Sequence, residues 1–391
     1  MTQHYTTGID VGTSQVKVVV VSSDTKEDGS AKEFPQIIGT GYAESRGLRN
    51  GYIVNESDVV RGIRNAVAQA EKSSGVKIKH AYISMGGIGL DEIHSRGEAI
   101  TSRADSVITQ ADIDKAIEMS ETNVQEKIPN RKILHAIPLQ YIVDGEKVHG
   151  RPHGLKGTKI EVDAFFITAF EQHLNDLVGA IESIGIKVDD IMASPLAESL
   201  IMLSKAQKRA GCVLTNIGAE TVSTVVFENN TPVSLKIFPL GSNDITNDIA
   251  LGLKITLEEA EKIKRGGMSS TTYSKKKLDE IVGARLSDIF ELIDAHLRKI
   301  KRDGLLPAGI ILTGGGSGTS GIQELARTSL RLPSKIAVLD PGVNGKVRDA
   351  SWAVGYGLCI WGMTGSEEES GINLARHAGS SLLNWFKQFL P

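Results

Sequence analysis

Residues 8–17 read Gly-Ile-Asp-Val-Gly-Thr-Ser-Gln-Val-Lys, a β-rich run that passes through a glycine turn into a second β-rich run. The two runs, residues 5–10 and 16–21, predict a hairpin with small hydroxylated residues at its tip. Asp10 ends the first strand, and the turn beyond it offers backbone N–H groups. Such a turn can hold phosphate oxygens, and a strand-end carboxylate can hold the water shell of a Mg²⁺ ion. Taken alone, the pattern still favours an ordinary hairpin.

The same arrangement returns roughly 200 residues later in the chain. Residues 213–217 and 222–227 are apolar runs that flank a second glycine turn, Gly218-Ala219-Glu220. We interpret this as an internal duplication, in which few residues are identical but the pattern of strand, glycine turn and strand is repeated. Two glycine turns on equivalent strands can face each other across a cleft and hold one phosphate chain.

A third glycine cluster lies in residues 310–316, where a predicted strand runs into Gly314, Gly315 and Gly316. Because glycine has no side chain, it allows the backbone to approach a flat ligand such as adenine with its ribose. A run of three glycines is by itself more often only a loop.

Length and composition limit the class of protein. A chain of 391 residues at roughly 150 per domain predicts two lobes or several subdomains. Forty-four basic against 47 acidic residues argue against a nucleic-acid binder. Cys212 and Cys359 lie far apart without a CxxC pair, which excludes a disulfide framework or an ordinary zinc site and indicates core thiols of a cytosolic protein. We expect a chain that is neither secreted nor membrane-spanning.

Alternating strands and helices along the chain predict an α/β protein. Residues 86–163 interrupt this alternation with a polar helix, residues 112–121, among short strands, and we interpret them as an inserted subdomain. Residues 364–379 carry three consecutive glutamates with several Gly and Ser, which is typical of a flexible linker.

In this order, the three glycine segments resemble those of the actin-like ATPase superfamily, and further segments narrow the resemblance to the FtsA family of bacterial cell-division proteins. Residues 239–250 and 260–264 resemble that family's Gly-Gly-x-x-Ile-Thr-x-Asp-Ile-Ala and Ala-Glu-x-x-Lys pair. Residues 144–145 and 151–157 resemble the end of a subdomain peculiar to the family, called 1C. Nearly the whole chain takes part in the resemblance.

The resemblance implies a two-lobed actin-like α/β fold with an inserted α+β subdomain 1C and a C-terminal amphipathic helix. It divides the chain into nine segments: 1–85 and 164–206 in subdomain 1A with a return at 346–363, 86–163 in 1C, 207–240 and 305–345 in 2A, 241–304 in 2B, a flexible linker at 364–379 and a membrane-targeting helix at 380–391.

The resemblance also implies ATP and Mg²⁺ as ligands, with Asp10 holding the metal through water. Thr13, Ser14 and Lys17 would donate to phosphate, and Glu261 and Lys264 would contact the adenosine. No residue is assigned to catalysis. The full predicted binding set comes from both lobes: Asp10, Gly12, Thr13, Ser14, Lys17, Asn216, Gly218, Ala219, Glu220, Gly241, Ser242, Glu261, Lys264, Gly314, Gly315 and Gly316.

The second glycine turn departs from the superfamily pattern, Asp-x-Gly-Gly-Gly-Thr-Thr. Asn216 stands in place of the carboxylate, and Glu220 in place of a turn glycine. We expect weaker phosphate binding than the family pattern suggests, and at most weak ATP hydrolysis. Glu220 near a γ-phosphate would repel it unless its side chain turns away.

The family resemblance further implies a role as a peripheral protein on the cytoplasmic face of the membrane at the division site. There it would polymerise, bind the C-terminal tail of the tubulin-like protein FtsZ through subdomain 2B and recruit later division proteins. At about 100° per residue, residues 382–390 form one apolar arc opposite Asn384, Lys387 and Gln388. The membrane-contacting side chains would be Leu382, Leu383, Trp385, Phe386, Phe389 and Leu390.

Two alternatives remain open. A PilM-like pilus assembly protein shares the fold and the cleft, but it is held at the membrane by its partner, so the linker and aromatic tail favour the FtsA family. A small-molecule kinase of the superfamily needs a carboxylate base in the cleft, and residues 194–198 offer only Glu198.

Overall fold

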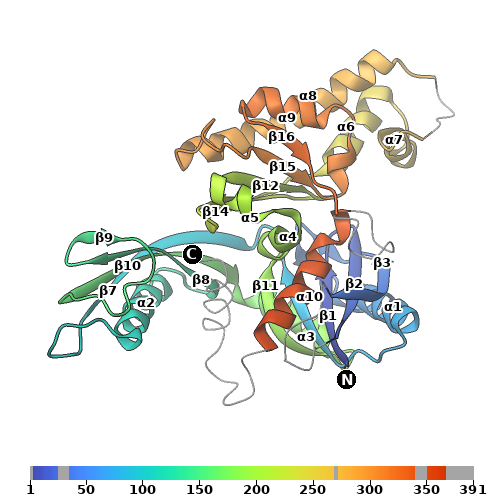
Figure 1. The fold of residues 1–391 in the computed structure, drawn as a ribbon. Helices are drawn as coiled ribbons and strands as arrows, with labels where there is room; N and C mark the ends of the chain where they lie inside the picture. Colours follow the sequence, from blue (N-terminus) through green and yellow to red (C-terminus); the bar gives the residue numbers. More distant parts are fainter. Residues whose placement is uncertain (1–2, 25–34, 268–271, 340–349, 367–391) are drawn as a thin grey trace.

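The computed structural model describes residues 3–24, 35–267, 272–339 and 350–366, and it has two lobes, each with a five-stranded sheet (Figure 1). The first sheet has the order β11-β6-β1-β2-β3. Strands β1 to β3 pair antiparallel, whereas β6 and β11 join in parallel. The strands are β1 Gln3–Val11, β2 Gln15–Asp24, β3 Gln36–Glu44, β6 His80–Met85 and β11 Lys187–Ala193.

The sheet of the second lobe repeats this plan, with the order β14-β13-β12-β15-β16. β12, β13 and β14 pair antiparallel, as β1, β2 and β3 do, and β15 and β16 join in parallel, as β6 and β11 do. This matching order and pairing confirm the internal duplication. The strands are β12 Cys212–Ile217, β13 Val222–Glu228, β14 Thr231–Phe238, β15 Ile310–Thr313 and β16 Ser334–Ile336.

Four α-helices accompany the first sheet: α1 Glu56–Ser74, α3 Glu171–Glu182, α4 Ser194–Met202 and α10 Ala353–Ser366. The short helix α5, Lys205–Ala210, follows α4 and packs on β13 of the second sheet. Asn55 caps α1 by accepting from the Asp58 N–H, and Gly75 ends it with φ 72°. A small hairpin of β4 Leu48–Arg49 and β5 Tyr52–Ile53 precedes α1.

The α10 helix packs closely against β1 and α4, and glycines make this possible. A Cβ on Gly8 would lie 2.2 Å from the carbonyl oxygen of Gly355, and one on Gly357 would lie 1.9 Å from that of Ala197. Tyr356 and Trp361 fill the core beside this contact. The contact therefore fixes α4, which lies between the two lobes (Figure 1).

The second lobe carries the helices α6 Ser242–Leu253, α7 Leu257–Lys264, α8 Lys275–Lys299 and α9 Ile322–Leu330, together with a short 3₁₀ helix, η1 Gly315–Gly318. In α8, Leu286, Phe290, Ile293 and Leu297 recur at helical spacing and are fully buried. This face of α8 packs with β12, β15 and α9 in the core of the lobe.

The inserted unit has its own sheet, β7-β10-β8-β9, with the strands β7 Leu90–Ile100, β8 Arg131–Val143, β9 Glu146–Val148 and β10 Lys159–Phe170. Helix α2, Gln110–Gln125, covers this sheet, and Thr109 and Asp112 form a capping box at its start. Ile113, Ile117, Val162 and Phe166 are buried in a separate core.

Two predicted boundaries differ from the structure. β10 continues past residue 163, the predicted end of the insert, because its antiparallel pairing with β7 runs on to Ala169. α10 continues to Ser366, so the predicted linker at 364–379 begins with helical residues. Residues 367–391, with the predicted membrane helix, lie outside the described residues. Among the described residues, none of the helices combines the length and apolar character that crossing a bilayer requires.

His135 joins the insert to the first lobe. Its Nε2 atom accepts the Ala193 N–H at 2.9 Å, at the point where β11 ends and α4 begins. The side chain is fully buried, and burial lowers its pKa to about 3. Nε2 accepts, so the neutral ring carries its proton on Nδ1, which has no hydrogen-bond partner.

This depressed pKa predicts a loss of stability in acid. Above pH 6.5 or so, His135 is neutral in both states, whereas below it only the unfolded chain binds the proton, so the free energy of unfolding falls. We expect the His135→Gln variant, which keeps an acceptor, to lose about 1.4 kcal/mol less per pH unit between about pH 6 and 4. Urea unfolding at several pH values measures this. The exposed His153→Gln is the control, and equal slopes in the wild type and His135→Gln would contradict the assignment.

Candidate functional site

A cleft of about 540 Å³ lies between the two lobes and receives residues from both. The first lobe contributes the β1–β2 turn and the residues that follow β6. The second contributes the β12–β13 turn, the 3₁₀ helix η1 and the facing parts of α6 and α7. Fourteen predicted residues line it: Asp10, Gly12, Thr13, Ser14, Lys17, Asn216, Gly218, Ala219, Ser242, Glu261, Lys264, Gly314, Gly315 and Gly316.

The two glycine turns are closed in the same way. The Gly12 N–H donates to the carbonyl of Gln15 at 3.1 Å, and the Gly218 N–H donates to the carbonyl of Thr221 at 2.9 Å. The duplication therefore extends to the backbone bond that shapes each turn. Both turns line the same cleft, as the sequence pattern predicts.

Asp10 is held in place from β6. The Ser84 hydroxyl donates to its Oδ1 at 2.7 Å. Burial raises the pKa of Asp10, while nearby Lys17 and the bond from Ser84 oppose that rise. Lys17 donates from Nζ to the carbonyl of Ser351 at 2.9 Å, just before α10 begins. The first turn is thus connected to α10 through a side chain predicted to hold phosphate.

The Asn216 side chain forms a hydrogen bond with a buried acid of the first lobe. Its Nδ2 donates to Oε1 of Glu198 at 2.8 Å, and the Thr313 hydroxyl donates to the same oxygen at 2.8 Å. Glu198 belongs to α4 and is 1% exposed. Burial raises its pKa to about 7, against the hydrogen bonds from Asn216 and Thr313.

Glu220 does not line the cleft. Its Oε2 accepts the Asn50 N–H at 2.6 Å, so the carboxylate points across to the β4–β5 turn of the first lobe. The predicted clash with a phosphate is therefore avoided, because the side chain turns away. Gly241 also lies outside the lining: its N–H donates to Asp244, and a Cβ there would meet the Ala219 carbonyl at 2.5 Å. The close approach of the Ala219 backbone explains why position 241 is a glycine.

The three consecutive glycines differ in what surrounds them. Gly314 has φ 80°, and a Cβ there would lie 2.4 Å from Oδ1 of Asn216. A Cβ on Gly316 would lie 2.4 Å from a methyl group of Ile217. Gly315 alone has open space where a side chain would stand. Two of the glycines are therefore required by packing on β12, and Gly315 leaves room in the cleft.

Glu261 and Lys264 form a compact polar cluster between α6 and α7. Lys264 Nζ lies 2.6 Å from Glu261 Oε2, which also accepts from Thr246 at 2.6 Å. Burial would raise the pKa of Glu261, but the bonds from Lys264, Thr246 and Arg265 lower it to about 2. The Lys264 side chain is only 8% exposed, so these residues are not merely a solvated helix face.

Several lining residues were missed by the sequence analysis, including Ser84, Gly86, Gly87 and Thr221. The run Ser84-Met85-Gly86-Gly87 is a strand end followed by two glycines, the same signal as in residues 310–316. Ser84 could therefore have been found by treating β6 as the parallel neighbour of β1.

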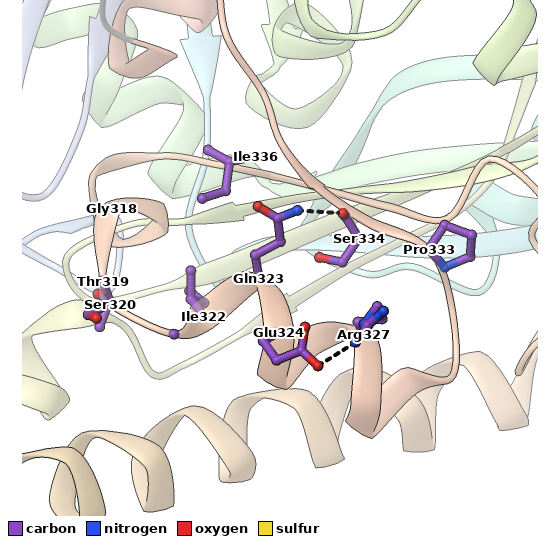
Figure 2. A pocket seen from close by; sticks show the side chains of 11 residues that line it. Gly318, Thr319, Ser320, Ile322, Gln323, Glu324, Arg327, Pro333, Ser334 and Ile336 are labelled. Carbon is purple, nitrogen blue, oxygen red and sulfur yellow. Dashed lines mark hydrogen bonds and ion pairs between the residues drawn. The ribbon is translucent and has the colours of Figure 1, made fainter. Parts of the chain in front are cut away.

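A second hollow of about 780 Å³ lies on the second lobe, around the start of α9 and β16 (Figure 2). It shares Gly318 and Thr319 with the cleft. Its only charged lining residues, Glu324 and Arg327, pair with each other, and Gln323 donates to the Ser334 carbonyl at 3.0 Å. The two charged side chains pair with each other, and the interlobe cleft, which receives the predicted residues from both lobes, is the stronger candidate for a ligand.

In the described part of the chain, no group of three or more His, Cys, Asp or Glu side chains is placed to bind a metal ion directly. The cleft instead offers single oxygen groups, such as the Asp10 carboxylate and the Asn216 amide oxygen.

Solved structures with a similar fold include a PilM-PilN type IV pilus biogenesis complex, with a TM-score of 0.69 at 16% identity, covering 91% of this chain and 98% of that chain. MreB5 of Spiroplasma citri bound to ADP matches with a TM-score of 0.53 at 12% identity, covering 94% of this chain and 99% of that chain. At these identities the likeness shows the fold alone, and it confirms the predicted two-lobed actin-like architecture.

Sequence comparisons identify the family. The model of cell division protein FtsA matches residues 213–357, and that of the SHS2 domain inserted in FtsA matches residues 91–168. Cell division protein FtsA of Bacillus subtilis is 30% identical, covering 90% of this chain and 81% of that protein. Its counterpart in Neisseria meningitidis is 30% identical, covering 99% and 98%. The chain therefore belongs to the FtsA family of cell-division proteins, with an actin-like fold.

Proposed function

We propose that this chain binds ATP with Mg²⁺ in the interlobe cleft and tethers FtsZ filaments to the cytoplasmic membrane at the division site. The observation that carries ATP binding is the pair of identically closed glycine turns that line one cleft from opposite lobes. Backbone N–H groups in such turns are suited to phosphate oxygens.

The residues in the cleft fit this ligand. Thr13, Ser14 and Lys17 would hold the phosphates, and Glu261 with Lys264 would contact the adenosine. Asp10, oriented by Ser84, would hold a hydrated Mg²⁺, because hard cations prefer carboxylate, amide and water oxygens. Bound Mg²⁺ would neutralise phosphate charge.

Gly315 provides the test of ATP binding, because a side chain there enters open space without disturbing β12. We expect Gly315→Trp to fill the cleft and weaken ATP binding about 100-fold, roughly 2.7 kcal/mol. Isothermal titration calorimetry with Mg²⁺ measures this. Gly179→Trp, on an exposed part of α3 that does not line the cleft, should bind as the wild type does. Unchanged affinity in Gly315→Trp would refute the site.

Hydrolysis should be slow, because β12 has no acidic residue of its own near its end. Asn216 cannot accept a proton from water, its N–H₂ group is engaged by Glu198, and Ser223 is opposite it on β13. We expect a wild-type turnover far below about 1 s⁻¹, a low value for enzymes. Phosphate release at saturating ATP measures it, and turnover of that order or faster would contradict the prediction.

Subdomain 2B, residues 241–304, is the proposed surface for the FtsZ tail. Within its described part, Leu251 is 77% exposed and Leu257 is 57% exposed, and Lys275, Lys276 and Lys277 are exposed at the start of α8. Exposed apolar and basic side chains on one subdomain are suited to binding a peptide segment. Self-association would be head to tail, through the lobes and the insert, since heterologous contacts build open filaments. Later division proteins would join such filaments.

Membrane attachment is proposed for residues 380–391, which lie outside the described residues. We expect the full chain to float with vesicles and to carry FtsZ with it, because the apolar arc at 382–390 buries in the lipid interface. A truncation after residue 379 and Phe386→Glu should not float. Gln388→Glu, which adds the same charge on the polar side of the helix, is the control. Flotation of the truncated chain at the wild-type level would remove the basis for the tether.

The alternatives have weaker support. The PilM-like alternative has the fold likeness, but the sequence comparisons identify the FtsA family. The kinase alternative needs a base facing a substrate, and Glu198 is buried and engaged by Asn216 and Thr313.

A further inference from the structure

Asn216 and Glu198 form a matched pair across the two lobes. Asn216 ends β12 of the second lobe, and Glu198 lies on α4, in the first. A carboxylate only accepts hydrogen bonds, so it selects the N–H₂ group of the amide and fixes which way the amide oxygen points.

The amide oxygen of Asn216 consequently faces the glycine loops of the cleft. A Cβ on Gly314 would lie 2.4 Å from Asn216 Oδ1, and one on Gly218 would lie 3.9 Å from it. Asn216 lines the cleft, whereas Glu198 is not among the lining residues. Glu198 therefore reaches the cleft through its hydrogen bonds with Asn216 and Thr313, and its charge also acts on Asp10 and Lys17.

We propose that Glu198 is a positioning residue that compensates for the carboxylate missing from β12, by turning the Asn216 amide oxygen towards the water shell of the nucleotide-bound Mg²⁺. This inference rests on the proposed nucleotide binding. A neutral oxygen at 216 can accept from a metal-bound water, and the buried acid behind it sets its orientation.

The pair also explains why the acid is not at position 216. An aspartate there would place a second carboxylate about 2.8 Å from the first, where the Asn216 Nδ2–Glu198 Oε1 bond now lies. Exchanging the amide and the acid between positions 216 and 198 reverses the direction of the hydrogen bond without removing it. In the double variant Glu198→Gln with Asn216→Asp, the new glutamine would donate to the new aspartate and to the Thr313 hydroxyl.

The experiment compares the wild type, Asn216→Asp, the double variant and Glu198→Ala. For each, the melting temperature is measured without nucleotide, and the Kd of ADP is measured with Mg²⁺ and with EDTA. The ratio of these two Kd values gives the Mg²⁺-dependent gain in affinity. Glu92→Gln is the control, because Glu92, on β7 of the insert, is another acid bonded to the second lobe, at Ser234 and Leu235, and does not line the cleft.

We expect Asn216→Asp to melt at a lower temperature and the double variant to recover the wild-type value. Glu198→Ala should lower the Mg²⁺-dependent gain about tenfold or more, with the Kd in EDTA little changed, as expected when the support of a metal-facing group is removed. The double variant should keep most of the gain, and Glu92→Gln should keep all of it.

Two results would overturn the inference. One is a double variant that melts no higher than Asn216→Asp, because the residues at 198 and 216 then do not stabilise the fold as an acid–amide pair. The other is a wild-type Mg²⁺-dependent gain in both Asn216→Asp and Glu198→Ala. If Glu198→Ala fails to fold, the double variant and Asn216→Asp decide. A wild type that does not bind ADP at all would instead refute the proposed function, and the melting temperatures would still test the pair.

Discussion

The close contact of α10 with β1 and α4 is the constraint on which the rest of the structure depends. Gly8, Gly355 and Gly357 bring backbone against backbone, so no larger residue fits without moving a helix. This contact fixes α4 between the lobes, and α4 in turn places Glu198 against the ends of β12 and β15. The position of Asn216 in the cleft thus depends on the packing of α10 against α4.

Three glutamates join the second lobe to the first lobe and to the insert by polar contacts. Glu198 accepts from Asn216 and Thr313, and Glu92 accepts from Ser234 and Leu235. Glu220, which belongs to the second lobe, accepts from Asn50 of the first. Each such bond to a charged group contributes about 1.5–3 kcal/mol, and water can replace it when it breaks.

The parts of the fold that follow from local patterns were predicted from the sequence. The glycine turns, the duplication and the cleft residues within those turns are of this kind, because a strand end and its turn are adjacent in the sequence. The partners of Asn216 and Glu220 could not be predicted, since Glu198 and Asn50 meet them only through the arrangement of the lobes. The continuation of β10 past Asp163 could not be predicted either, because the strand that it pairs with there lies 67 residues away in the chain, at Arg96.

The bond from the Asn50 N–H to Glu220 makes one backbone proton a reporter of the state of the cleft. Asn50 lies in a surface turn, where an amide without a tertiary partner would exchange rapidly with solvent. Within the described part of the chain, the hydrogen-bond partner of this N–H is a carboxylate on the other lobe. The exchange rate at this position therefore measures how often the lobes separate, and a nucleotide that holds them together would slow it without touching Asn50.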